Sequence, residues 1–128
     1  MPRVFKAIEI EKEEKEIMRD YLDRHMPHVI CPDSVQRGEK FMVKVRMGEE
    51  YPHPDQDDHY IGLLQLWNRE TLLAEARYSA GVNGHQPSHV EVDFFIVAPE
   101  VSMNLSAMAV CTKHGLWQSE DKAVKVTD

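Results

Sequence analysis

The chain has 128 residues, of which 42% are hydrophobic and 29% are charged, and its formal net charge is −7. This length predicts one domain, residues 1–128, with a core of its own. The acidic balance argues against a nucleic-acid partner. No apolar run reaches the ~18 residues of a membrane helix, and the N-terminal segment lacks the apolar stretch of a secretory signal. We therefore expect a cytoplasmic protein that binds neither nucleic acid nor a membrane.

The first segment predicts a helix from about Phe5 to Arg24. Its apolar residues fall at steps of three and four, as on one face of a helix. The charged run from Glu11 to Glu16 interrupts them, and it is typical of a solvated helix face. We expect residues 1–24 to form an N-terminal helical arm.

After Pro27 the apolar residues alternate with polar ones, which indicates strands. Turn residues such as Pro32, Gly38, Gly81 and Gly84 separate the alternating segments. Seven strands are expected, near residues 29–31, 41–47, 59–67, 71–79, 90–96, 105–111 and 124–126. Regular turn spacing and the lack of a second helical segment favour an all-β, antiparallel β-sandwich over residues 25–128.

Four histidines and one cysteine stand out as candidate metal ligands. Cys111 and His114 form a Cys-x2-His pair, His53 and His59 lie on the proline-bounded segment PHPDQDDH, and His25 precedes a Met-Pro pair. Five ligands are too many for structural zinc, which is nearly always four-coordinate. They suit an iron with one position open, where the thiolate is the electron-rich donor. Such a site indicates redox chemistry on a small ligand.

Three motifs carry a resemblance to a known family. They are DRHMP (23–27), PHPDQDDHYI (52–61) and CTKHGLW (111–117). In these motifs the chain resembles superoxide reductases, and specifically the one-domain type called neelaredoxin within the desulfoferrodoxin family. The resemblance runs from about Leu22 to Trp117. It implies an immunoglobulin-like sandwich that carries one mononuclear non-haem iron.

The resemblance also implies ligands, reaction and partners. The equatorial histidines of the family correspond to His25, His53, His59 and His114, and its axial cysteinate to Cys111. The implied reaction is the one-electron reduction of superoxide to hydrogen peroxide. A rubredoxin-like electron donor would reduce the iron again, and relatives form dimers or tetramers, so we expect a homo-oligomer.

Two residues depart from the family pattern. The family usually has Glu-Lys-His where this chain has Asp23-Arg24-His25. The family's Glu closes the sixth iron position in the oxidised state, and Asp23 is one methylene shorter. The family's Lys attracts superoxide and organises proton delivery, whereas Arg24 keeps the charge but stays protonated and donates hydrogen bonds with a different geometry. We expect Asp23 and Arg24 to be the candidate catalytic residues, with Asp23 either an iron ligand or a carboxylate outside the ligand set.

Charge near the ligands is of both signs. Asp55, Asp57 and Asp58 lie in the His53–His59 loop and would repel an anion, while Arg24 and Lys113 flank ligands and could form a positive opening. Because the Debye length is about 8 Å at physiological salt, local charge matters more than the total.

The remaining candidates have structural interpretations. We expect His28, His85 and His89 to lie outside the site, Cys31 to be a buried thiol, and Trp67 and Trp117 to be packing residues. Two other functions remain open: a blue-copper electron carrier and a non-enzymatic metal-binding or interaction sandwich. A blue-copper site takes two histidines, one cysteine and usually a weak methionine, and no methionine follows His114.

Overall fold

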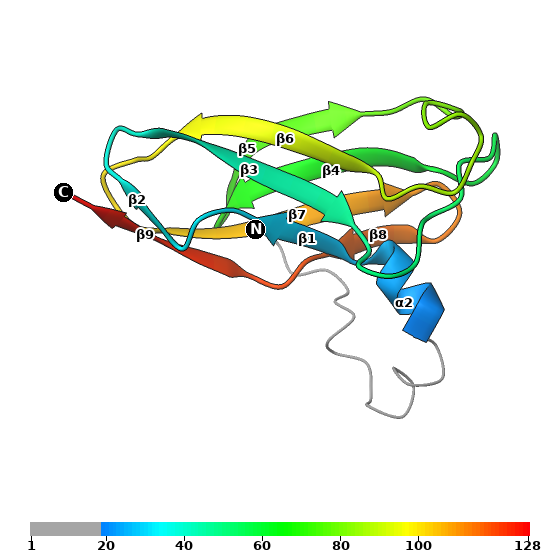
Figure 1. Ribbon diagram of the computed structural model, residues 1–128, viewed down its shortest axis with the longest axis horizontal. Coiled ribbons are helices and arrows are strands. Elements are labelled where there is room, and N and C mark those ends of the chain that lie inside the picture. Colours follow the sequence, from blue (N-terminus) through cyan, green and yellow to red (C-terminus); the bar gives the residue numbers. More distant parts are fainter. Residues whose placement is uncertain (1–18) are drawn as a thin grey trace.

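A computed structural model describes residues 19–128, and Figure 1 shows two β-sheets packed face to face with a short helix at one end. The helix is α2 (Arg19–His25). Within the described residues there are nine strands: β1 (Pro27–Ile30), β2 (Ser34–Gln36), β3 (Lys40–Met47), β4 (Ile61–Asn68), β5 (Thr71–Arg77), β6 (Glu91–Val97), β7 (Met103–Cys111), β8 (Gly115–Gln118) and β9 (Lys122–Thr127). The predicted all-β sandwich is confirmed.

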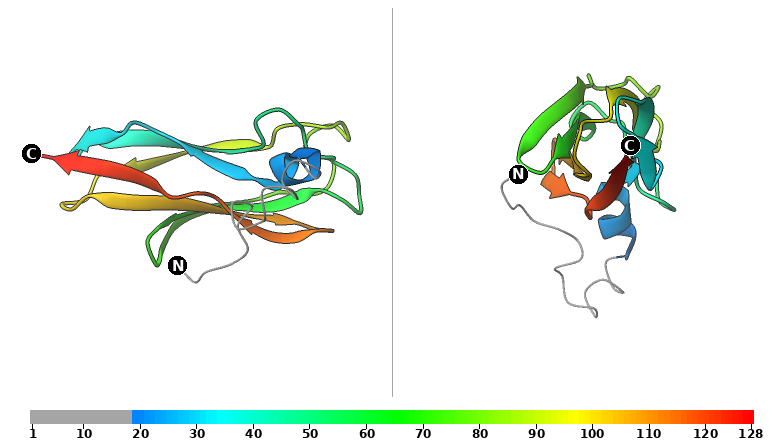
Figure 2. Two further views of the ribbon diagram at one scale, coloured as in Figure 1. Left: turned by 90° about the horizontal axis from the view of Figure 1, so that it is seen from below. Right: turned by 90° about the vertical axis from the view of Figure 1, so that its left-hand side faces the viewer.

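The strands form two layers, which are seen from the side in Figure 2. One layer is a three-stranded sheet with the order β1-β3-β6. The other has the order β2-β9-β7-β4-β5, and β8 pairs with β7 beside this path. All described pairs are antiparallel except β2 with β9, whose residues Ser34–Gln36 run parallel to Lys125–Thr127.

The prediction of seven strands, all antiparallel, was wrong in two details. It missed β2 and β8, which have only three and four residues. Strands of this length are too short to show an alternating pattern. The parallel pairing of β2 joins segments about ninety residues apart, and local sequence carries no signal for it.

The core lies between the two sheets and follows the predicted alternation. In β3 the inward residues Phe41, Val43, Val45 and Met47 are all buried, and Met42 between them is exposed. In β7 the inward face predicted from 105 to 111 is buried throughout. Burying one such aliphatic side chain stabilises the fold by about 1.5–3 kcal/mol, so these two central strands anchor the sandwich.

The helix α2 and the ends of several strands meet at one pole of the sandwich, at the right of Figure 1, while the C-terminus lies at the opposite pole. The predicted helix from Phe5 to Arg24 lies outside the described residues as far as Met18, and α2 is its described part. In residues 19–128 we find no helix with the length and apolar character needed to cross a membrane.

Candidate metal centre

Cys111 and His114 are positioned by a tight hairpin. Cys111 ends β7 and pairs with Gly115, the first residue of β8, whose φ of 83° closes the turn. The backbone N–H of His114 donates to the Cys111 Sγ at 3.3 Å, and the His114 Nδ1 lies 3.7 Å from the same sulfur. The Cys-x2-His spacing therefore places one sulfur and one ring nitrogen on the same side of the turn.

His25 is the last residue of α2 and is fully buried. Its Nδ1 lies 2.6 Å from the carbonyl oxygen of Tyr21, one helical turn earlier. Because Nδ1–H donates to this carbonyl, Nε2 is left as the free donor atom for a metal. The ring stacks on Trp117 with centroids 5.0 Å apart, so the imidazole has little freedom to turn.

His59 and His53 lie on the irregular segment between β3 and β4. The segment is attached to the hairpin beside His59, where the Thr112 N–H donates to the Tyr60 carbonyl at 3.0 Å. His53 is attached to Ser88 by two backbone hydrogen bonds of 2.9 and 3.0 Å. The His53 Nδ1 lies 2.7 Å from the Pro54 carbonyl oxygen, and its Nε2 lies 3.3 Å from the Cys111 sulfur.

The four imidazoles form a closed ring. Neighbouring centroids are 5.0 Å apart for His25–His53, 4.8 Å for His53–His59, 4.9 Å for His59–His114 and 4.9 Å for His114–His25. Each neighbouring pair is steeply tilted, at 75–82°, whereas His25 and His59 face one another across the ring at 6.4 Å. This is the arrangement expected of four planar donors around one central atom, with the Cys111 sulfur beside them.

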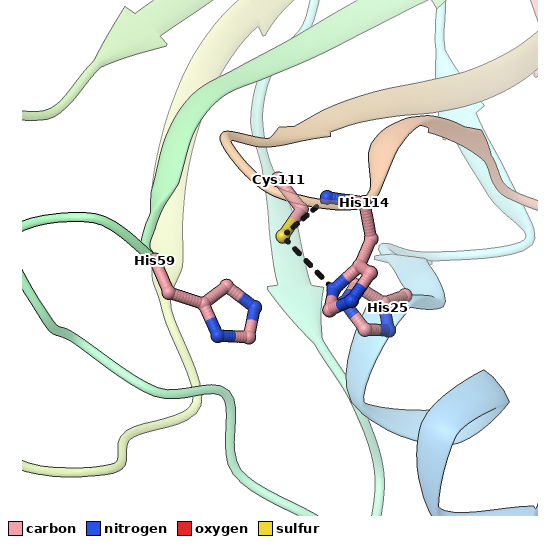
Figure 3. Close-up of side chains that lie close together, drawn as sticks. All are labelled: His25, His59, Cys111 and His114. Atoms are coloured by element: carbon pink, nitrogen blue, oxygen red, sulfur yellow. Dashed lines mark hydrogen bonds between the residues drawn. The ribbon is translucent and has the colours of Figure 1, made fainter.

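The donor atoms converge, as the close-up in Figure 3 shows for four of the residues. The ligand atoms of His25, His59, Cys111 and His114 lie within 4.8 Å of one another. The Nε2 atoms of His25 and His59 are buried and have no hydrogen-bond partner in the described part of the chain, residues 19–128. An unsatisfied buried polar atom is costly, and a bound ion would satisfy both nitrogens. His53 stands outside that group of four, but its Nε2 contacts the same sulfur.

The electrostatics favour neutral imidazoles and a protonated thiol when no metal is present. Burial, as the main cause, lowers the pKa of His25 and of His53 to about 4. Burial also raises the pKa of the Cys111 thiol, against the opposing effect of the Lys113 and His114 backbone N–H groups and the Lys113 charge. Neutral imidazole is the form that binds a metal, and a metal ion would be needed to hold Cys111 as a thiolate.

Four imidazole nitrogens and one sulfur fit iron. Structural zinc is nearly always four-coordinate and tetrahedral, so a set of five donors does not suit it. Imidazoles together with a thiolate are a donor set that would suit redox-active iron. The residues present therefore fit a five-coordinate iron.

Asp23 and Arg24 occupy different surroundings. The Asp23 carboxylate accepts hydrogen bonds from the backbone N–H groups of Glu49, Glu50 and Tyr51 at 3.1, 3.0 and 2.7 Å. Burial opposes ionisation, but these three bonds lower the pKa of Asp23 below its usual value. The Arg24 guanidinium contacts Asp20, and its charge contributes to lowering the pKa of His25, His53 and His59.

The three histidines that were predicted to lie outside the site do lie outside the ring of imidazoles. His89 contacts the Met47 carbonyl, His85 pairs with Asp57, and His28 lies 3.9 Å from Glu49. Cys31 is a free, half-buried thiol that packs against the core, where a buried one was predicted. Trp117 is buried and donates from Nε1 to the His114 carbonyl.

Asp55 is the site residue whose role the sequence analysis missed. It was interpreted only as a repelling charge in the His53–His59 loop, but it is 2% exposed. Its carboxylate accepts hydrogen bonds from the backbone N–H groups of Gly81, Asn83 and His85 at 3.0, 2.9 and 3.0 Å. Gly81 and Gly84 indicated a turn in that loop, but no local sequence signal connected the turn with Asp55.

The chain matches the model of the Desulfoferrodoxin family over residues 9–120. The superoxide reductase of Pyrococcus furiosus is 28% identical over 110 residues, which cover 77% of this chain and 86% of that protein. The neelaredoxin of Megalodesulfovibrio gigas is 27% identical over 117 residues, which cover 80% and 87% of the two chains.

Solved structures agree with these relatives. The neelaredoxin-type superoxide reductase of Ignicoccus hospitalis superposes with a TM-score of 0.72 at 25% identity, over 97% of this chain and 95% of its own. The family match spans most of the chain and includes the three motifs that surround the converging histidines and Cys111. The chain therefore belongs to the desulfoferrodoxin family, the family of the superoxide reductases.

Proposed function

We propose that this protein is a superoxide reductase. Its reaction is the reduction of superoxide by one electron and two protons to hydrogen peroxide. The metal is one mononuclear iron per chain, held by His25, His53, His59, His114 and Cys111. The observation that carries the proposal is the ring of four imidazoles with the Cys111 sulfur beside it, in which two buried nitrogens have no hydrogen-bond partner among residues 19–128.

The ligand residues are oriented for this task by their other contacts. His25 and His53 each present Nδ1 to a backbone carbonyl oxygen, which fixes the tautomer with Nε2 free and increases its donor strength. The Trp117 ring stacks on His25 and excludes water from that side. When bound, the iron supplies the electron for superoxide, and the electron-rich Cys111 thiolate favours that transfer.

Two cations next to the site favour the approach of an anion. Arg24 follows Asp23 on α2 and is partly exposed, and Lys113 lies in the turn between Cys111 and His114. Both charges act on the ligands, since each contributes to lowering the pKa of His59, though less than burial does. The chain as a whole has a formal charge of −7, so this local positive charge must guide superoxide over the last ~8 Å.

The Asp55 carboxylate lies inside the protein, and the three backbone N–H dipoles that bind it partly offset its charge. Asp57 is exposed and pairs with His85. We therefore assign the attraction of superoxide to Arg24 and Lys113.

The iron must be reduced again after each turnover, and we propose a rubredoxin-like protein as the electron donor. We also propose a cytoplasmic location and a dimer or tetramer of this chain. Both cysteines in the chain are free thiols, as is common in a reducing compartment. The exposed edge strands β5 and β6 could pair with further copies.

Anaerobic iron loading followed by assay tests the function. We expect about one iron per chain, a visible absorption band that appears on oxidation, and superoxide consumption that depends on a reductant. Peroxide should form without dioxygen, because dismutation would release dioxygen and reduction does not. One zinc per chain with no superoxide consumption, or an intense blue copper band, would contradict the proposal.

A further inference from the structure

The irregular segment that carries His53 is held by Asp23 on its N-terminal side. One carboxylate oxygen of Asp23 accepts the Glu49 N–H, and the other accepts those of Glu50 and Tyr51. The turn is packed closely on α2: a Cβ at Gly48 would lie 2.7 Å from the backbone carbonyl oxygen of Tyr51 and 3.2 Å from that of Asp23. The segment thus approaches His53 with its backbone fixed two residues before the imidazole.

Asp55 holds the same segment on its C-terminal side. Its two oxygens accept three N–H groups from the loop between β5 and β6, those of Gly81, Asn83 and His85. The same loop pairs with His53 itself through Ser88. Asp55 is buried and lies two residues after His53, so His53 stands between two carboxylates that each bind three backbone amides.

Within residues 19–128, no strand ladder runs along this segment. His53 and His59 take part in isolated bridges outside the strands, His53 with Ser88 and His59 with Gln56. Hydrogen bonds to an ionised carboxylate are stronger than those between neutral groups. Asp23 and Asp55 each add three such bonds on either side of His53, beyond the two backbone bonds that join His53 to Ser88.

We propose that Asp23 and Asp55 are positioning residues that hold the His53 segment in its donor geometry before the metal binds. The proposal rests on the proposed function for the identity of the metal, but not for the geometry. A consequence concerns Asp23 as a possible iron ligand. An Asp23 carboxylate that bound the iron would give up hydrogen bonds to these amides, so we expect Asp23 to stay off the iron in the oxidised state too.

The direct test is amide hydrogen exchange on the iron-free protein and two variants. Asp23→Asn should accelerate exchange at Glu49, Glu50 and Tyr51 about tenfold or more, and Asp55→Asn should do the same at Gly81, Asn83 and His85. Asp20→Asn and Asp57→Asn are the matched controls, because both side chains are exposed and lie on the same two segments. Amides of β4, such as those of Leu64 and Leu66, are the internal reference.

Unchanged exchange at the two sets of amides would overturn the proposal, and so would equal acceleration throughout β4, which would mean general destabilisation. If Asp55→Asn does not fold, Asp23→Asn decides alone. These rates need no metal, so they remain decisive if the chain takes up no iron and the proposed function fails. In iron-loaded protein, the absorption maximum of oxidised Asp23→Ala should match that of the unaltered chain; a shift confined to the oxidised state would place Asp23 on the iron.

Discussion

Cys111 and His114 lie in the hairpin between β7 and β8, whereas His53 and His59 lie on the irregular segment between β3 and β4. The hairpin is fixed by sheet register, with Cys111 opposite Ile61 on one side and Gly115 on the other. The irregular segment has no such register. The Asp23 side chain of α2 holds its start, and its own Asp55 side chain binds it to the loop between β5 and β6. A ligand on a strand end is positioned by the fold itself, but a ligand on a loop requires separate restraints.

The hairpin and the irregular segment also differ in the chemical role of the candidate ligands that they carry. The hairpin carries the candidate sulfur ligand and the candidate nitrogen ligand that follows it three residues later, a pair that is local in sequence. The segment carries two candidate nitrogen ligands whose positions depend on α2 and on the loop between β5 and β6. Changes in the hairpin should therefore alter the electronic properties of the site, and changes around the segment should alter how well it is assembled.

The largest effect is expected from Cys111→Ser. Loss of the thiolate removes the electron-rich donor, so superoxide reduction should fall by about 100-fold or more and the visible sulfur-to-iron band should disappear. Cys31→Ser is the matched control, because Cys31 is the other free thiol and lies directly after β1. An active Cys111→Ser variant with its band intact would show that the sulfur is not a ligand.

The next largest effect is expected from His59→Ala. Removing one of the five donors should weaken iron binding by about 100-fold, since even partners outside the first ligand shell contribute 10–100-fold. His89→Ala should leave binding unchanged, because the His89 ring contacts the Met47 carbonyl outside the cluster. Competition with a chelator of known affinity measures both, and equal affinities would remove His59 from the ligand set.

Substituting one glycine in each region tests how tightly the backbone is packed there. Gly48 precedes the irregular segment with φ 73°, and Gly115 closes the hairpin with φ 83°. A Cβ at Gly115 would meet nothing within 4 Å, so Gly115→Ala should cost only the left-handed strain of about 1–2 kcal/mol. A Cβ at Gly48 would lie 2.7 Å from a backbone oxygen, and Gly48→Ala should cost about 3 kcal/mol.

Denaturant unfolding of the two iron-free variants measures this comparison. Gly48→Ala should lose more free energy of unfolding than Gly115→Ala. Equal losses, or a larger one for Gly115→Ala, would mean that the turn at Gly48 can move away from Tyr51 without cost. That turn would then be no tight support for the irregular segment.

The smallest effect is expected from Arg24→Ala. Removing one cation beside the site should slow the association of superoxide several-fold and weaken its dependence on salt. Arg37→Ala removes the same charge at the far pole, where Arg37 pairs with Asp128, and should leave the rate nearly unchanged. Pulse radiolysis at several ionic strengths measures both rates, and identical salt slopes would exclude guidance by Arg24.

The longer strands were predictable from sequence because one face of each packs on the core. Alternation identified the buried positions of β3 and β7, including Val43, Val45 and Ala107. The short strands β2 and β8 were not predictable, since three or four residues contain too little of the period. The parallel pairing of β2 with β9 depends on contacts distant in sequence, such as Val35 with Val126.

The five candidate ligands could be named from motif spacing and family resemblance, but their support could not. Spacing shows that Cys111 and His114 can share a turn, because that is a local property. It does not show which carboxylate faces inward: Asp55 and Asp57 are two residues apart, and only Asp55 is buried. The direction of Asp23 toward residues 49–51 likewise depends on how α2 packs.

X-ray absorption at the iron edge of the loaded, reduced protein tests the central claim most directly. Five donors around one iron predict one sulfur neighbour and four nitrogen neighbours, with a vacant sixth position. Iron that shows no sulfur neighbour, or that has six light-atom neighbours in the reduced state, would contradict the account.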